Sequence, residues 1–207
     1  GTKFYVDLLS KEHNHHRSYK DIKILINKSS IDKKVKEFKD IRLIEGINFS
    51  DERGNLKKTI YGNDLNSLMP TVSELLCVTS KKGVLRGMHF QEPPHDLSKF
   101  ITCINGKILD VFVDLRKSSK TFKKVGSFEL SSNDKYSLFI PNGFAHGYLV
   151  LSESATVAYL QSNDYNPDYD KSINPLSLDF KWPLNELLLS EKDKDAVSID
   201  NYVTTFN

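Results

Sequence analysis

The sequence has few of the features that mark several common protein classes. Only two of its 207 residues are cysteines, Cys77 and Cys103, and no C-x-x-C motif is present. Two cysteines are too few for a disulfide framework. We therefore expect the fold to depend on an apolar core in a reducing compartment, the cytoplasm. The first residues also lack the basic and then apolar pattern of a secretory signal peptide.

Long apolar runs and an excess of one charge are also missing. No apolar run approaches the ~18–20 residues that a membrane-spanning helix needs, so we expect no membrane association. The 29 Lys and Arg residues nearly balance the 27 Asp and Glu residues, which gives a net charge of +2. Domains that bind nucleic acid are usually strongly basic, so nucleic acid is not an expected partner. A hydrophobic fraction of 39% and a charged fraction of 27% are typical of a globular protein.

The chain divides into two parts of different amino-acid composition. Residues 1–35 contain the run HNHH at 13–16, many lysines and no glycine after Gly1. Within this part, residues 21–27 predict a strand and residues 31–38 predict a short helix. We therefore expect an N-terminal extension of unknown role over 1–35 and one domain over 36–207.

Short apolar runs separated by turn residues predict that this domain is all-β. The expected strands cover residues 125–130, 136–140, 147–151 and 155–161. Many short strands at such spacing favour a sandwich or a barrel.

The region around residue 105 carries two further signals. Asn105-Gly106 stands between two apolar runs, and this dipeptide is the strongest short signal for a β-hairpin. In the run that follows, Leu109, Val111, Val113 and Leu115 alternate with polar positions that include Asp110 and Asp114. This alternation predicts a half-buried strand with the apolar residues on one face and the aspartates on the other.

Two glycine-rich clusters contain the residues that are most suited to chemistry. They read GVLRGMHFQ over 83–91 and FIPNGFAHGYLVLS over 139–152, and each places a histidine, His89 or His146, beside glycines. A single histidine in a strand is more often a satisfied core residue, but two in similar settings favour a shared pocket. The pattern P-x-G-x-x-H at 141–146 resembles the second motif of the cupin β-barrels. Metal-binding cupins carry H-x-H in the first motif, where this chain reads His89-Phe90-Gln91. Two histidines are too few ligands for a metal, so we expect metal-free chemistry.

Taken in order, six motifs resemble the dTDP-4-dehydrorhamnose 3,5-epimerase family, a branch of the cupins. They are GVLRGMHFQ, LDVFVDLRKSSKTF, FIPNGFAHGYLVLS, DYNPDYD, WP and LSEKD, and they cover roughly residues 36–195. The resemblance implies an all-β, cupin-type double-stranded β-helix, or jelly-roll barrel, with a small C-terminal helical and loop segment. It also implies a homodimer with exchanged N-terminal strands and an enzyme that needs no cofactor.

The resemblance implies a nucleotide-linked 4-keto-6-deoxy sugar as substrate, on a route to cell-surface polysaccharide. The ketone acidifies the C–H bonds at C3 and C5, so a base can remove one proton and form an enolate. A proton then returns to the opposite face of the carbon. This chemistry requires a base with a pKa near neutrality, an acid and a group that stabilises the enolate.

The motif positions assign roles to nine residues. The expected catalytic residues are the base His89, its carboxylate partner Asp193, Lys99 near the enolate oxygen and the acid Tyr159. The expected substrate-binding residues are Arg53, Arg86, Gln91, His146 and Tyr165. Imidazole suits the role of base because its unperturbed pKa is about 6.5.

Some positions depart from the family pattern and leave the substrate open. Lys58 stands where the family has a glutamate, and Glu74, Leu76 and Val78 replace a polar Q-x-N-x-S set that helps hold the nucleotide. A GDP-linked sugar is therefore an alternative to a dTDP-linked one. Alternative functions are a 3,4-ketoisomerase, an epimerase of C3 alone, and a non-catalytic sugar-nucleotide-binding domain of a larger protein.

Overall fold

The computed structural model describes residues 4–5, 16–17 and 38–207. Strands β1 (Phe4–Tyr5) and β2 (His16–Arg17) form a short antiparallel pair. The strand predicted over 21–27, the first three residues of the HNHH run and all but the last residue of the helix predicted over 31–38 lie outside the described residues. No helix in the described part of the chain is long and apolar enough to span a membrane.

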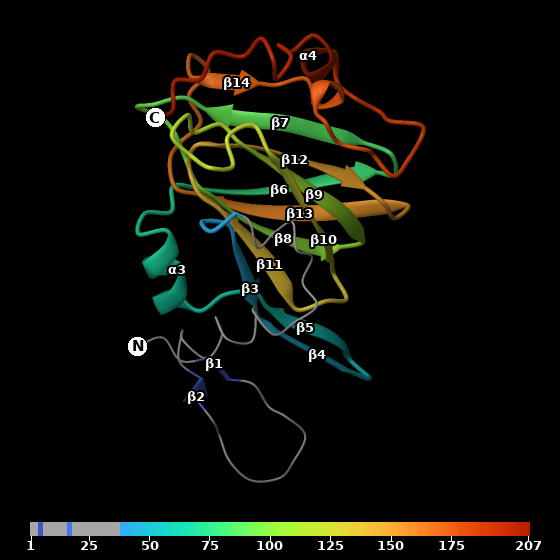
Figure 1. Ribbon diagram of the computed structural model, residues 1–207. Coiled ribbons are helices and arrows are strands. Elements are labelled where there is room, and N and C mark those ends of the chain that lie inside the picture. Colours follow the sequence, from blue (N-terminus) through green and yellow to red (C-terminus); the bar gives the residue numbers. More distant parts are fainter. Residues whose placement is uncertain (1–3, 6–15, 18–37) are drawn as a thin grey trace.

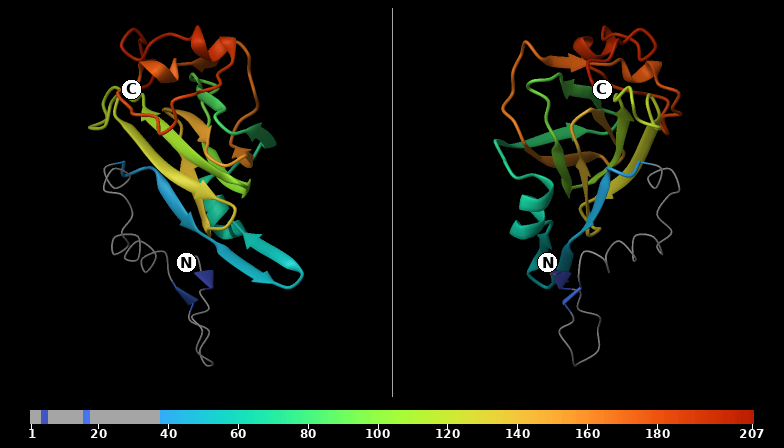
Figure 2. Two further views of the ribbon diagram at one scale, coloured as in Figure 1. Left: turned by 90° about the vertical axis from the view of Figure 1, so that its right-hand side faces the viewer. Right: turned by 60° about the vertical axis from the view of Figure 1, so that its left-hand side comes forward.

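Two five-stranded antiparallel sheets face each other and form the body of the molecule (Figure 1 and Figure 2). Sheet I has the strand order β10 (Val125–Ser131), β9 (Lys107–Asp114), β12 (Phe144–Val150), β7 (Leu85–Gln91) and β14 (Asp170–Ser172). Sheet II has the order β3 (Arg42–Glu45), β11 (Tyr136–Ile140), β8 (Lys99–Asn105), β13 (Ser154–Gln161) and β6 (Glu74–Lys81). The prediction of an all-β jelly roll is therefore confirmed.

The remaining elements lie around these two sheets. Strands β4 (Ile47–Asp51) and β5 (Gly54–Lys58) form a hairpin that extends away from the body (Figure 1). Helix α3 (Gly62–Leu68) follows this hairpin. The short helices η1 (Pro175–Ser177) and α4 (Glu191–Lys194) belong to the segment after β14, beside sheet I.

The predicted hairpin at Asn105-Gly106 is wrong. Strand β8 pairs with β11 and β13, whereas β9 pairs with β10 and β12, so this turn carries the chain from one sheet to the other. A two-residue hairpin of this type needs positive φ at both residues, but only Gly106 of the two has it, at 77°. A Cβ atom at Gly106 would lie 2.1 Å from the Ser154 carbonyl oxygen, so the corner requires glycine.

Strand β9 is buried on both faces, which corrects the prediction of a half-buried strand. Ile108 and Phe112 point into the apolar core between the sheets. Val111 and Val113 pack on the opposite side of sheet I, in a second apolar cluster that the C-terminal segment completes. That segment contributes four buried residues, namely Ile173, Leu178, Ile199 and Phe206.

Helix α3 covers only part of the outer face of sheet II. Met69, which follows the helix, packs on Phe100 and Phe139 of the sheet. Farther along the same face, Leu75 and Ile104 remain 67% and 51% exposed. These two side chains line an open cavity of about 580 Å³ between sheet II and strand β5.

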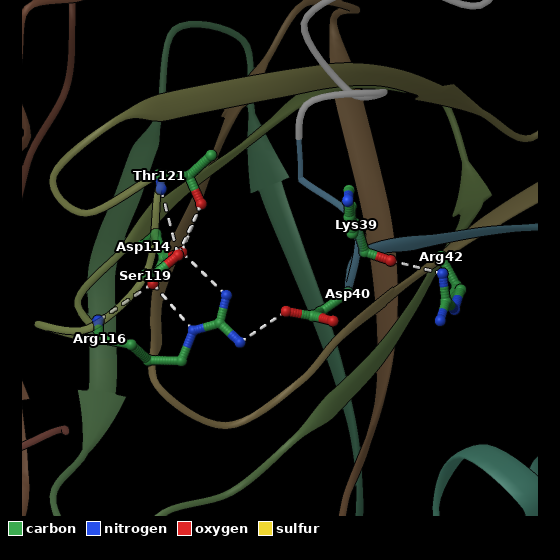
Figure 3. A network of polar contacts seen from close by, with 7 residues as sticks. All are labelled: Lys39, Asp40, Arg42, Asp114, Arg116, Ser119 and Thr121. Carbon is green, nitrogen blue, oxygen red and sulfur yellow. Dashed lines mark hydrogen bonds and ion pairs between the residues drawn. The ribbon is translucent and has the colours of Figure 1, made fainter.

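A buried carboxylate ties the beginning of the described domain to the loop after β9 (Figure 3). Asp114 accepts hydrogen bonds from the Arg116 guanidinium at 2.8 and 2.9 Å and from the hydroxyls of Ser119 and Thr121 at 2.6 Å. Arg116 also pairs with Asp40 at 2.7 Å. Burial raises the pKa of Asp114, but the hydrogen bonds from Arg116, Ser119 and Thr121 outweigh burial and lower it overall.

We predict that Asp114→Asn lowers the free energy of unfolding by about 2–3 kcal/mol at pH 7, because Arg116 loses a buried ionic partner. The lowered pKa of Asp114 means that this stabilisation is fully present above pH ~4, the usual aspartate range. It disappears as the pH falls through the pKa of the folded state. Urea unfolding at several pH values measures the difference.

Asp179→Asn is the matched control, because Asp179 is exposed. This variant should unfold like the wild type at every pH. An equal loss of stability in the two variants, or a loss at Asp114 that does not depend on pH, would contradict the proposed role of the network.

Candidate active site

Strand β7 carries His89 into the interior between the sheets. In the register of β7 and β12, His89 lies opposite His146, and residues directly opposite in a ladder share one face. Arg86 lies opposite Tyr148, so β7 has one more residue than β12 over this stretch. This is a β-bulge, a feature that re-aims the side chains of the strand that carries it.

Two glycines make this bulge possible. Gly87 has a φ of 119°, and a Cβ atom there would lie 2.5 Å from the Cα atom of Gly147 on β12. A Cβ atom at Gly147 would in turn lie 2.5 Å from the Arg86 carbonyl oxygen. The glycines that drew attention in the two motifs therefore have a shared physical role, since they allow β7 and β12 to approach closely beside both histidines.

His89 and Asp193 form a hydrogen-bonded pair across 104 positions of sequence. His89 Nε2 lies 2.6 Å from Asp193 Oδ1, and Asp193 is buried in helix α4, whose first turn is capped by Ser190. Burial raises the pKa of Asp193, but hydrogen bonds from His89, Ser190 and the Gly87 N–H lower it overall. An ionised Asp193 must accept the hydrogen bond, so His89 Nε2 carries a proton and Nδ1 is the basic nitrogen.

A second histidine–carboxylate pair lies beside the first. His146 Nε2 is 2.8 Å from Asp110 Oδ2, and both side chains are buried. Burial lowers the pKa of His146 and raises that of Asp110. Asp110 is a site residue that the sequence analysis missed, because strand alternation placed it on the face opposite the apolar residues. The sequence feature that could have identified Asp110 is its position as an acidic residue in the middle of an apolar strand.

Lys99 brings a positive charge to the same place. Its Nζ donates a hydrogen bond to the His89 carbonyl oxygen at 3.1 Å. Burial lowers the pKa of Lys99 to about 8, while the carboxylates of Asp170 and Asp110 limit the fall. Lys99 therefore remains a cation at neutral pH and can stabilise negative charge that develops on a substrate oxygen.

Tyr159 enters the site from sheet II, opposite the histidines of sheet I. Its ring centroid lies 5.8 Å from that of His146 and 6.3 Å from that of Tyr148. Burial raises the pKa of Tyr159 well above its usual value, and Tyr148 and Asp110 add to the increase. The phenol is therefore protonated at neutral pH and can act as a proton donor.

The other predicted site residues lie at different depths. Arg86 is exposed, and its Nε donates to the Ser80 hydroxyl at 2.9 Å. Tyr165 is exposed in the loop before β14, whereas Gln91 is buried and bonded to loop backbone. Arg53 lies outside this group, at the exposed turn of the β4–β5 hairpin, where it pairs with Asp51 at 2.6 Å.

Among the residues that the structure describes, no three His, Cys, Asp or Glu side chains are grouped to hold a metal ion. Fold and site together define the class: a cupin-type jelly-roll enzyme whose groups are arranged for proton transfer. The sequence profile described as dTDP-4-dehydrorhamnose 3,5-epimerase matches residues 35–201. The chain belongs to this family of epimerases, and therefore to the isomerases.

Named relatives and solved structures agree with this assignment. The dTDP-4-dehydrorhamnose 3,5-epimerase of Shigella flexneri is 37% identical over 162 residues, which are 76% of this chain and 90% of the relative. That of Salmonella typhimurium is 37% identical over 172 residues, 80% and 94% of the two chains. The crystal structure of the Sulfolobus tokodaii enzyme has a TM-score of 0.75 at 36% identity and covers 81% of this chain and 94% of its own.

Proposed function

We propose that this protein epimerises a dTDP-linked 4-keto-6-deoxy sugar at C3, C5 or both, in the biosynthesis of cell-surface polysaccharide. The observation that carries the proposal is the placement of a basic histidine on one sheet and a protonated tyrosine on the facing sheet. Epimerisation needs these two groups on opposite sides of a carbon. The identity of the nucleotide is supported by a solved relative from Legionella pneumophila in complex with dTDP-4-keto-L-rhamnose, 32% identical with a TM-score of 0.73 over 84% of this chain and 91% of its own.

Four side chains supply the groups that the proposed reaction needs. His89 Nδ1 takes the proton from the carbon beside the ketone, and the C–H electrons move into the carbonyl to give an enolate. Asp193 stabilises the imidazolium that forms, and Lys99 stabilises the enolate oxygen. Tyr159 then delivers a proton to the opposite face of the same carbon as the ketone returns. Exchange with water restores the proton of Tyr159 and removes that of His89.

One observation favours a narrower alternative, the inversion of C3 alone. ChmJ of Streptomyces bikiniensis, a 3'-monoepimerase solved in complex with dTDP-quinovose, resembles this chain with a TM-score of 0.73 at 30% identity, over 78% and 84% of the two chains. Both reactions use one base and one acid, so the stereochemistry of the product distinguishes them.

A cytoplasmic location completes the functional proposal. The two cysteines suit a reducing compartment, which supports this location. Cys77 is exposed and Cys103 is buried, and both are free thiols.

We predict that wild-type protein in D₂O incorporates deuterium next to the ketone of a dTDP-linked 4-keto-6-deoxy sugar, and that His89→Asn abolishes this incorporation. Asp193→Asn should slow it by about 10²–10⁴-fold, because His89 loses the carboxylate that orients it. The exposed neighbour Asp195 provides the control, and Asp195→Asn should react like the wild type. NMR of the sugar protons follows each position.

The same assay with the GDP-linked sugar tests the nucleotide. Faster exchange with the GDP compound would replace dTDP in the proposal. Exchange that persists in His89→Asn would remove His89 as the base. No exchange with either nucleotide, from folded wild-type protein, would refute the epimerase proposal.

We predict that Tyr159→Phe slows formation of the inverted sugar by about 10²-fold or more but slows deuterium incorporation much less. His89 can still remove and return a proton on its own face, whereas the other face has lost its acid. The ratio of exchange to inversion, measured by NMR in one reaction, is the relevant quantity. An unchanged ratio would assign the acid to another group.

We also propose that the protein is a homodimer. Leu75 and Ile104 leave an apolar surface on sheet II beside the β4–β5 hairpin, and the cross-strand pair Phe49 and Leu56 is exposed on that hairpin. Monomeric proteins rarely leave such surfaces uncovered. A second copy that covers them would receive Arg53, at the turn of the hairpin, near its own sugar-nucleotide site.

We predict a solution mass of twice one chain for the wild type and a monomer for Leu75→Lys, both measured by light scattering. Arg53→Ala and His89→Asn proteins should each have low activity. When the two proteins are mixed and their subunits exchange, activity should rise several-fold, because each mixed dimer contains one complete site. A monomeric wild type, or a mixture without recovered activity, would contradict this assembly.

A further inference from the structure

The loop between β13 and β14 is anchored by Gln91, two residues beyond His89 on β7. Gln91 Nε2 donates to the carbonyl oxygens of His95 at 2.7 Å and Asp164 at 3.1 Å. Its Oε1 accepts a hydrogen bond from the Asn166 N–H at 2.6 Å. The side chain is only 4% exposed, and both amide hydrogens are used within the protein. Gln91 therefore acts on this loop, whereas its motif position predicted that it binds substrate.

Glu74 anchors the same loop from the other sheet. Its Oε1 accepts a hydrogen bond from the Tyr165 N–H at 2.9 Å, and Glu74 is the first residue of strand β6 in sheet II. Asp164, Tyr165 and Asn166 are thus held through the backbone at three successive residues. The side chain of Tyr165, in contrast, is 59% exposed. The protein fixes the backbone of this tyrosine and leaves the ring available.

The anchored tyrosine lies beside the catalytic groups. Strand β14 follows the loop and pairs with β7, where Ser172 is opposite His89. Lys192, the neighbour of Asp193, pairs with Asp170 of β14 at 2.5 Å. The hydrogen bond to Asp170 raises the pKa of Lys192, and nearby Tyr165 and Asp193 add smaller contributions. Asn166, the neighbour of Tyr165, is bonded to Gln91, so the Tyr165 backbone lies beside the strand that carries His89.

We propose that Gln91 and Glu74 are positioning residues that hold residues 164–166 so that the Tyr165 ring forms a preset platform for a flat face of the sugar nucleotide. The proposal rests on the epimerase function proposed above. A ring on a loose loop would have to be ordered each time a ligand binds, and that ordering weakens binding. Gln91 and Glu74, one from each sheet, order the loop before the ligand binds, so less binding free energy is spent on ordering it. This task requires only an acceptor oxygen at position 74, which the glutamine of the family pattern also supplies.

The test compares Glu74→Leu and Gln91→Met with Glu74→Gln, which keeps an acceptor oxygen for the Tyr165 N–H. The first two should raise KM for the sugar nucleotide roughly three- to tenfold, the range expected for a lost aromatic contact, with kcat changed less than about twofold. Glu74→Gln should restore KM to near the wild-type value. A fall in kcat with unchanged KM would overturn the proposal.

A double-mutant cycle with Tyr165→Ala separates positioning from general structural damage. In the Tyr165→Ala background, Glu74→Leu should raise KM by less than about twofold, because the ring it positions is gone. The same fold-change with and without Tyr165 would show that Glu74 acts elsewhere and would overturn the proposal. Glu74 lies on an edge strand, so its variants also provide the test if Gln91→Met fails to fold.

Amide hydrogen exchange tests the anchors without any substrate. The amide of Tyr165 should exchange at least tenfold faster in Glu74→Leu, and that of Asn166 in Gln91→Met, with other sheet amides unchanged. Unchanged exchange at these amides would overturn the anchoring itself. If the anchors are confirmed while wild-type protein epimerises no sugar nucleotide, the proposed function fails and the platform for a sugar nucleotide fails with it.

Discussion

The hydrogen-bond pairing of buried carboxylates governs how this molecule is built. A charged side chain removed from water destabilises the fold unless it meets an opposite charge or hydrogen-bond partners. Asp193 meets His89, Asp110 meets His146, and Asp114 meets Arg116. Two of these three pairs belong to the candidate active site, where each imidazole is held by a carboxylate. The stability of the sandwich and the orientation of its reactive groups thus depend on the same contacts.

Alternating apolar residues and closely spaced turns are local properties, and they were sufficient to predict an all-β sandwich or barrel. The jelly roll in particular followed from the family resemblance. The motifs also named the residues that the structure brings together, namely His89, Lys99, His146, Tyr159 and Asp193. Their catalytic roles stay predictions until exchange and inversion are measured. Asp193 was predicted from the order and spacing of the motifs, which reflect the whole fold. Viewed alone, Asp193 resembles an ordinary charged residue of a polar tail.

The wrong predictions have a common physical cause. Local sequence patterns do not reveal which distant segments will pack against a strand or turn. Asn105-Gly106 turns the chain in either a hairpin or a corner, and the pairing of β8 and β9 with other strands decides which one forms. The alternation in β9 was read correctly, but the face that carries Asp110 also carries Ile108 and Phe112 and lies against the core between the sheets. Residues about 60 to 90 positions later, such as Ile173 and Phe206, cover the other face. Asp110 was misplaced for the same reason. The anchoring of Tyr165 by Gln91 and Glu74 also joins segments far apart in sequence.

The segment after β14 is synthesised after the strands of both sheets. It supplies Asp193 to the active site and also covers the apolar outer face of sheet I through Leu178, Ile199 and Phe206. While a ribosome is still making this segment, both sheets can already pair, yet sheet I is exposed and His89 has no carboxylate. An incomplete chain therefore lacks the hydrogen-bond partner of His89 and exposes apolar surface that favours aggregation.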